Sequence, residues 1–178
     1  GTYGVREHQP PEYFDGGERV GSEGGASSDI GTQYSVFTGI YLGSDIDAVH
    51  YDFCEKPPSS IAGRVHADPG ADCDFDDPNN HWLAGVTIDL LDKDGNVIAT
   101  TKTDAGGAYK FTGLARGQYT VREHQPTEYF DGGERVGSVG GHSYDQGEAF
   151  SFITAITLPY GTDAVHDDFC EEPPSSIA

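Results

Sequence analysis

The sequence predicts an all-β protein built as a β-sandwich. Three observations lead to this prediction: short segments alternate between apolar and polar residues, clusters of turn residues separate them, and no segment has the periodicity of a helix. Gly and Pro account for 25 and 10 of the 178 residues, and aromatic residues make up 11% of the chain. This composition is typical of short strands that are joined by many turns.

The C-terminal two thirds of the chain contain seven segments that alternate between apolar and polar residues as strands do. The turn 92–96 between two of them contains Gly and Asn, which tolerate positive φ and favour a tight hairpin. Seven short strands in 116 residues are typical of two packed sheets. The segment 131–147 is rich in Gly and Ser, and we expect a long loop there, either mobile or ligand-binding. The predicted strands are 61–67, 86–90, 97–103, 109–111, 119–121, 150–158 and 164–170.

An internal repeat dominates the chain. Residues 1–62 align without a gap with residues 117–178, an offset of 116, and 42 of the 62 aligned pairs are identical. We therefore interpret residues 1–62 as the C-terminal half of one repeat and residues 63–178 as one complete repeat. The segment 171–176, like 55–60, is a short Pro-containing connector. We expect the chain to be part of a longer tandem array.

The charge of the chain excludes several classes of partner. It has 30 acidic and 10 basic side chains, with a formal net charge of −20. Nucleic acids are bound through clustered Lys and Arg, and anionic membrane surfaces attract basic segments, so neither is expected as a partner. No apolar run approaches 18 residues, so the sequence predicts no membrane insertion through a helix.

Several motifs occur in an order that resembles a known family. IAGRVHAD (61–68), LAGVTIDLLD (83–92) and TDAGGAYKF (103–111), followed by GLARGQYTVRE (113–123), are similar to the SdrD B-like domain. The resemblance covers residues 63–135 and, through the repeat, residues 1–20. It implies Ig-like sandwiches in tandem on bacterial surface proteins, and calcium binding in many members.

The densest group of candidate ligands is the acidic loop after the first predicted strand. Hard cations such as Ca²⁺ take six to eight oxygen ligands, which closely spaced Asp side chains in a Gly-containing loop supply. The resemblance implies calcium here, although Gly70 and the Asn79–Asn80 pair stand where the family has acidic residues. A solvated acidic loop without a metal is the alternative. The predicted calcium ligands are Asp68, Asp72, Asp74, Asp76, Asp77 and Asn79.

Three cysteines leave two pairings open: Cys73 with Cys170 inside the repeat, or Cys54 with Cys73 across the connector. In a sandwich with an odd number of strands, the first and last strands end at the same pole. Cys73 follows the first strand and Cys170 ends the last, whereas Cys54 lies roughly 20 Å away at the opposite pole. That distance exceeds the reach of a disulfide, so the sequence favours Cys73–Cys170. Two cysteines per repeat suit an oxidising, extracellular environment.

Other residues receive structural interpretations. Trp82 could stack on a sugar but more commonly packs against its neighbours. Glu7 and Glu123 lie where related domains have the carboxylate that assists a Lys–Asn cross-link, but Arg64 replaces the Lys, and we expect a Glu at the edge of the core. No motif of a catalytic nucleophile is present, so an enzyme is not expected.

The sequence thus predicts a structural module of an extracellular stalk, surface fibre or filament, stiffened by calcium and a disulfide. Its expected partners are neighbouring repeats of the same protein and other copies in a fibre. The alternative is an adhesion module that binds glycan or protein through the 131–147 loop or Trp82.

Overall fold

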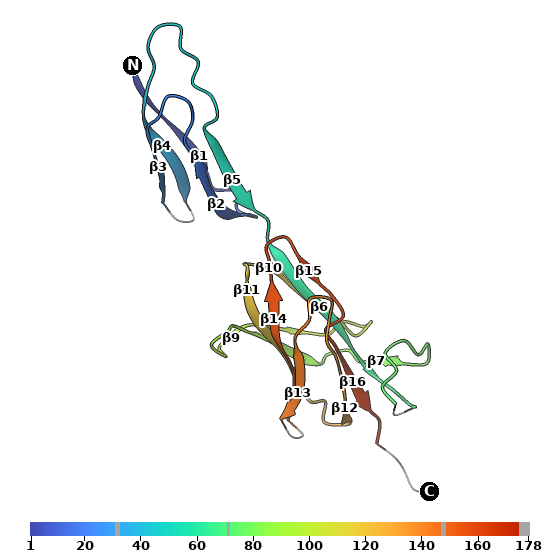
Figure 1. Ribbon diagram of the computed structural model, residues 1–178. Coiled ribbons are helices and arrows are strands. Elements are labelled where there is room, and N and C mark those ends of the chain that lie inside the picture. Colours follow the sequence, from blue (N-terminus) through green and yellow to red (C-terminus); the bar gives the residue numbers. More distant parts are fainter. Residues whose placement is uncertain (31–32, 71, 147–148, 175–178) are drawn as a thin grey trace, which may run out of the picture. The chain divides into compact units, whose positions relative to one another are not determined.

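The computed structural model describes the chain except residues 31–32, 71, 147–148 and 175–178. The chain divides into two compact units, Gly1–Pro58 and Ser59–Ala178, and each is described here by itself. The described residues form strands and turns without a helix (Figure 1). No element of this part of the chain has the length and apolar character of a membrane-spanning helix.

The described part of the first unit contains five strands: β1 (Thr2–His8), β2 (Phe14–Arg19), β3 (Ala26–Asp29), β4 (Tyr34–Tyr41) and β5 (Asp52–Lys56). The described part of the second unit contains β6 (Ser59–Ala67), β7 (His81–Trp82), β8 (Thr87–Leu91), β9 (Val97–Lys102), β10 (Ala108–Leu114), β11 (Gly117–His124), β12 (Phe130–Arg135), β13 (His142–Gln146), β14 (Phe150–Leu158), β15 (Asp163–Ala164) and β16 (Asp168–Glu172).

The second unit is an Ig-like β-sandwich, so the predicted fold class is confirmed. One sheet has the order β10-β6-β16-β12, and the short strands β7 and β15 also pair with β6. The other sheet has the order β13-β14-β11-β8-β9 (Figure 1). The strand β16 runs parallel to β6, with Phe169 opposite Val65 and Cys170 opposite His66. Because these strands are parallel neighbours, the N-terminal end of β6 and the C-terminal end of β16 lie at opposite poles of the unit.

The core fills the space between the two sheets. Every second residue of a strand faces the same side, and these inward positions carry branched apolar side chains. The strand β6 also approaches β16 closely at Gly63, where a Cβ atom would lie 1.8 Å from the carbonyl oxygen of Asp167. Only Gly fits at this position. The fully buried apolar residues of the second unit include Ile61, Val65, Ile88, Leu90, Val121, Ile153, Ile156 and Phe169.

The predicted strands are present, but the predicted number of seven is too low. The segment 131–147, expected to be a long loop, contains most of β12 and β13, and its last residue lies outside the described residues. The expectation of a loop was wrong because the Gly residues that suggested it lie at irregular points between and within strands. Gly133 has positive φ at a bulge, and Gly140 and Gly141 have positive φ at a turn. A high Gly content therefore marks irregular strand geometry here, and pairing with β16 and β14 overrides the weak strand propensity of the segment.

The boundary between the units also differs from the expectation. The division between residues 62 and 63 lies inside β6, whereas the compact units separate after Pro58. A sequence repeat fixes the period of an array but not the residue at which a folded unit begins. Ser59 and Ser60 belong to the second unit, where Ser60 pairs with Asp163 of β15.

The first unit repeats the strand pairing of the second half of the sandwich. Its strands β1, β4 and β3 pair in the order of β11, β14 and β13, and β2 pairs with β5 as β12 pairs with β16. Even the bulges recur, between Tyr3 and Val5 as between Tyr119 and Val121. The burial differs: Tyr3 is 56% exposed, whereas Tyr119 is 9% exposed. The described residues of the first unit include no counterparts of β6 and β8–β10, which cover this face in the second unit.

We expect that residues 1–58 expressed alone will show no cooperative thermal transition, because half of a sandwich leaves its apolar face in water. Circular dichroism during heating measures this, and residues 59–178 serve as the control that should melt cooperatively. A sharp unfolding transition of residues 1–58 would contradict this account of the core.

Candidate functional site

The acidic loop begins directly where β6 ends. The backbone N–H of Asp68 donates to the carbonyl oxygen of Glu171 at 2.9 Å, which fixes the loop to β16. The Asp68 side chain is buried and accepts hydrogen bonds from the N–H groups of Gly70 (2.7 Å) and Asp72 (3.1 Å). These hydrogen bonds lower the pKa of Asp68 because they stabilise its charged form, and the bond from Gly70 has the largest effect.

The other predicted ligands organise the loop through short-range hydrogen bonds. Asp72, Asp74 and Asp77 each accept the N–H of the residue two positions later, at 3.4, 3.0 and 2.8 Å. This is the geometry of Asx turns. Asp76 instead forms an ion pair with Arg135 of β12, with 3.3 Å between Oδ1 and Nη1. Asn79 donates its side-chain amide to Asp77 at 2.9 Å.

The structure brings some of these oxygen atoms together. A Cβ atom at Gly70 would lie 3.1 Å from Oδ1 of Asp68 and 3.4 Å from Oδ1 of Asp72, so the two carboxylates flank this residue. Asn80, which was not among the predicted ligands, is buried, and its Oδ1 has no hydrogen-bond partner among the described residues. Carboxylate and amide oxygens are the ligands that a hard cation such as Ca²⁺ takes, so the side chains of the loop fit this ion. In the sequence, the Asn79–Asn80 pair at the end of the acidic loop is the feature that could have indicated Asn80 as a further candidate ligand.

The disulfide joins Cys73 of this loop to Cys170 of β16, with a Cα–Cα distance of 5.9 Å. This is the pairing that the sequence favoured, and the parallel pairing of β6 with β16 places both residues at one pole. Gly132 of β12 packs on the disulfide, and a Cβ atom there would lie 2.6 Å from Sγ of Cys73. Cys54, the repeat equivalent of Cys170, is free and exposed.

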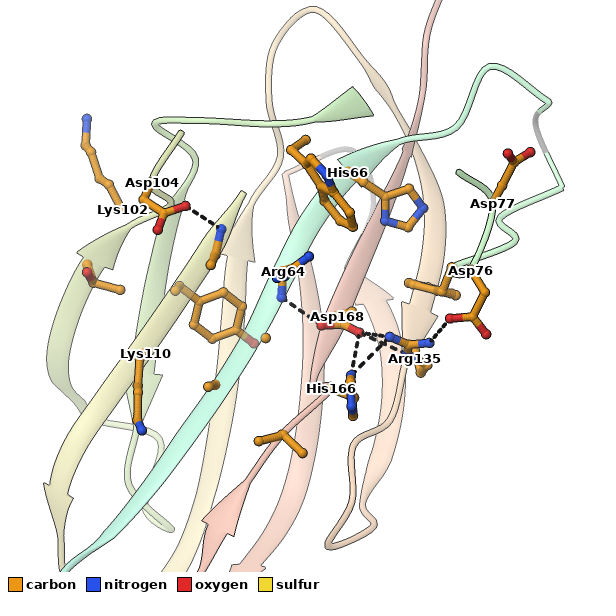
Figure 2. Close-up of a pocket in the computed structure, with 18 of the residues that line it drawn as sticks. Arg64, His66, Asp76, Asp77, Lys102, Asp104, Lys110, Arg135, His166 and Asp168 are labelled. Atoms are coloured by element: carbon orange, nitrogen blue, oxygen red, sulfur yellow. Dashed lines mark hydrogen bonds and ion pairs between the residues drawn. The ribbon is translucent and has the colours of Figure 1, made fainter. Parts of the chain in front are cut away.

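A pocket of about 750 Å³ lies beside the loop, over β6, β10 and β16 (Figure 2). Its wall carries Trp82, which is 41% exposed, and the guanidinium of Arg64 lies 4.8 Å from the centre of the indole ring. Lys102 and Lys110 also line the pocket. Asp76, Asp77, Asp104 and Asp168 line it too, so the basic side chains share the pocket with an equal number of acidic ones.

Arg135 connects the pocket to the loop. Figure 2 shows Asp168 between Arg64 and Arg135, with Asp76 beyond Arg135. The Nε atom of Arg135 donates to Oδ2 of Asp168 at 2.9 Å, and the N–H of Arg64 donates to Oδ1 at 2.7 Å. Because the Asp168 side chain is buried and satisfied on both oxygen atoms, Arg135 has a fixed position in the pocket wall.

Several carboxyl groups of the second unit are buried or half-buried. Burial, with the neighbouring Glu171, raises the pKa of Glu123 well above its usual range. Burial also raises the pKa of Glu134 to about 8, with Asp145 as the next cause, and that of Glu171 to about 7. Glu123, expected at the edge of the core, is fully buried. No spacing in the sequence marks these residues as a group, although each of them recurs in the repeat.

The domain model "SdrD B-like domain" matches residues 59–170. The chain belongs to the SdrD B-like domain family. This family consists of structural domains of surface proteins and not of enzymes, so the chain is a structural module of a surface protein. The expectation that it has no catalytic role is therefore confirmed.

The similar curated proteins are long staphylococcal proteins. Serine-aspartate repeat-containing protein F of Staphylococcus epidermidis is 34% identical over 129 residues, which are 72% of this chain and 7% of that protein. Serine-aspartate repeat-containing protein D of Staphylococcus aureus (strain Newman) is 35% identical over 92 residues, 52% of this chain and 7% of that protein. The chain thus spans less than a tenth of the length of these relatives.

Solved structures resemble the chain more distantly. The minor pilin GBS52 of Streptococcus agalactiae has a TM-score of 0.43 at 14% identity, over 82% of this chain and 61% of that one. The Bacillus anthracis TIE protein has a TM-score of 0.42 at 15% identity, over 79% of this chain and 25% of that one.

Proposed function

We propose that the chain is a load-bearing module of an extracellular tandem-repeat protein, such as a stalk, surface fibre or filament, whose partners are neighbouring repeats. One observation carries this proposal: β6 and β16, the first and last strands of the second unit, are parallel neighbours that a disulfide joins. Tension on a tandem array enters a unit at its first strand and leaves at its last. In this unit those two strands are in direct contact.

The parallel arrangement determines how tension acts on the unit. Pulling at Ser59 and at Glu172 draws β6 and β16 past each other along their length, so the ladder hydrogen bonds between them share the load. The disulfide lies between the two strands on this path. With Cys73 and Cys170 joined, tension bypasses the chain between these two residues, which are separated by 97 positions in the sequence, and the core of the sandwich carries no load.

Single-molecule pulling on the ends of the chain tests the proposal. Under oxidising conditions, we expect no extension from the segment between Cys73 and Cys170. After reduction, unfolding of the second unit should release an additional length of roughly 320–350 Å, since an extended residue spans 3.3–3.6 Å. Reduction should also lower the free energy of unfolding by about 3–5 kcal/mol, because the closed loop is long.

The Cys54→Ser variant is the matched control, because Cys54 is free in this chain. Its replacement should change neither the length released under oxidising conditions nor the length released after reduction. If the oxidised chain released the full length of the second unit, the proposed path of tension would be wrong.

We further propose that calcium binds the loop 68–79 and stiffens the exit of β6. The exit is fixed to β16 by the Asp68–Glu171 hydrogen bond, and the flanking carboxylates of Asp68 and Asp72, with Oδ1 of Asn80, supply oxygen atoms. An ion that binds only the native state stabilises it by RT ln(1 + [L]/Kd). With Gly70 and Asn79 in place of acidic residues, we expect a Kd of roughly 10⁻⁴ to 10⁻³ M.

Adding several millimolar calcium to chelator-treated chain should raise its melting temperature. In the Asp72→Ala, Asp74→Ala double variant, the part of this rise that depends on the loop should be lost. Asn80→Asp should strengthen binding, because a carboxylate replaces an amide oxygen as a ligand. Equal calcium responses of the wild type and the double variant would show that the loop is a solvated acidic segment.

The pocket supports a second candidate function, adhesion to an acidic glycan or protein. Its exposed Trp82 and its cationic side chains are the features that recognise a sugar ring and a negative charge. Trp82 is the only Trp in the sequence, so tryptophan fluorescence reports on this pocket directly. We expect a sulfated oligosaccharide to change this fluorescence, and a neutral oligosaccharide of equal length to leave it unchanged.

In the Lys102→Ala, Lys110→Ala variant the response to the sulfated oligosaccharide should weaken at least about tenfold, since two favourable charge interactions are lost. The Lys93→Ala variant is the control, because Lys93 lies outside the pocket and pairs with Asp94. An unchanged response of the double variant would contradict binding in this pocket.

A further inference from the structure

The pocket over β6, β10 and β16 contains an arginine whose side-chain donors are unused. The guanidinium of Arg64 lies over the Trp82 ring, 4.8 Å from its centre. The backbone N–H of Arg64 donates to Asp168, but its side chain forms no hydrogen bond or ion pair with any described residue (Figure 2). A guanidinium has five N–H donors in a planar fork. This one is in contact with the ring and still open to a ligand.

The four acidic side chains of the pocket are engaged elsewhere. Asp76 and Asp168 are both bound to Arg135. Asp77 and Asp104 each accept the backbone N–H of the residue two positions later, at 2.8 Å in both cases. The acids of the pocket therefore have partners of their own, and the guanidinium over the indole ring is left for an anion from outside.

The Arg64–Trp82 pair rests on a packed aromatic base. His66 lies on the same face of β6 as Arg64, because every second residue of a strand faces one side, and it is buried. Its ring packs edge-on against Phe75 and Trp82, with 5.0 and 5.9 Å between the ring centres. The pairing of β6 with β7 places Trp82 opposite His66. A ligand thus meets a surface that is already ordered, which lowers the entropic cost of binding.

The balance of charge in the pocket indicates how many charges the ligand carries. Because equal numbers of acidic and basic side chains line it, a densely charged polyanion meets repulsion as well as attraction. A sugar with a single carboxylate fits better. Its carboxylate accepts two parallel hydrogen bonds from a guanidinium, its hydroxyl groups both donate and accept, and its apolar face suits the exposed surface of Trp82.

We propose that this pocket binds a glycan that carries one carboxylate among neutral sugar rings, and that Arg64 is the partner of that carboxylate. The proposal rests on the second candidate function above, adhesion through this pocket, and names its ligand. A peptide with one acidic side chain offers the same carboxylate without the ring and its hydroxyl groups, so it should bind more weakly.

Calorimetric titration of the full chain tests the ligand class with matched probes. These are glucose trisaccharides in which none, one or all three of the rings are glucuronic acid, and the peptide acetyl-Ala-Glu-Ala-amide. One carboxylate should strengthen binding at least about tenfold over the neutral trisaccharide, as a hydrogen bond to a charged group does. Three carboxylates should change the affinity less than about threefold further. The fluorescence of Trp82, the single Trp of the sequence, should follow the same titrations.

Variants at Arg64 test its role, and their folding is not at risk because this side chain is exposed. Arg64→Ala should bind the neutral and the singly charged trisaccharide equally. Arg64→Lys keeps the charge without the planar fork, so it should bind the singly charged one about tenfold more weakly than the wild type. The matched control is Arg6→Ala, because Arg6 lies over the Tyr34 ring at 4.5 Å, outside this pocket. It should keep the wild-type preference.

The outcomes separate this inference from the adhesion on which it rests. If the triply charged trisaccharide bound at least tenfold more tightly than the singly charged one, or if Arg64→Ala kept the preference for the carboxylate, the inference would be wrong and adhesion through the pocket would stand. Binding of the peptide as tight as that of the singly charged trisaccharide would overturn the assignment to a glycan. No binding of any acidic probe would contradict adhesion itself and the inference with it.

Discussion

The parallel contact between β6 and β16 is the constraint on which the rest of the second unit depends. Gly63 has no room for a side chain because the carbonyl oxygen of Asp167 lies against it. The same contact brings Phe169 opposite Val65, and both are fully buried in the core. It also aligns the exits of the two strands, so the loop after β6 and the end of β16 share one pole.

The features at that pole reinforce one another. The Asp68–Glu171 hydrogen bond and the Cys73–Cys170 disulfide both connect the loop to β16. The disulfide leaves no room for a side chain at position 132 of the neighbouring strand β12, and the residue there is Gly. Arg135 of β12 adds ion pairs to Asp168 and Asp76. The first and last strands are thus connected by backbone, covalent and ionic contacts, which is a suitable arrangement for a module of a surface protein.

The distribution of charge divides the unit into different environments. The pocket brings together four basic side chains and four acidic ones. They are Arg64, Arg135, Lys102 and Lys110, with Asp76, Asp77, Asp104 and Asp168. The buried acids Glu123 and Glu171 lie where no cation of the protein neutralises them among the described residues, and burial raises the pKa of both. Charge is therefore balanced by opposite charges in the pocket, whereas at the buried acids the raised pKa values favour the neutral, protonated form.

The sequence by itself determined the fold class and the period of the repeat, and it favoured the cysteine pairing. Alternation along a strand and an internal repeat can be read from the sequence alone, whereas the parallel pairing of β6 with β16 is what places Cys73 and Cys170 at one pole. The strands β12 and β13 could not be predicted from the sequence, because a Gly-rich segment is typical of a loop. Only their pairing with β16 and β14 makes them strands. The burial of Glu123 and Asn80 was also decided only by tertiary structure, since it depends on how strands and loops that are distant in the sequence pack together.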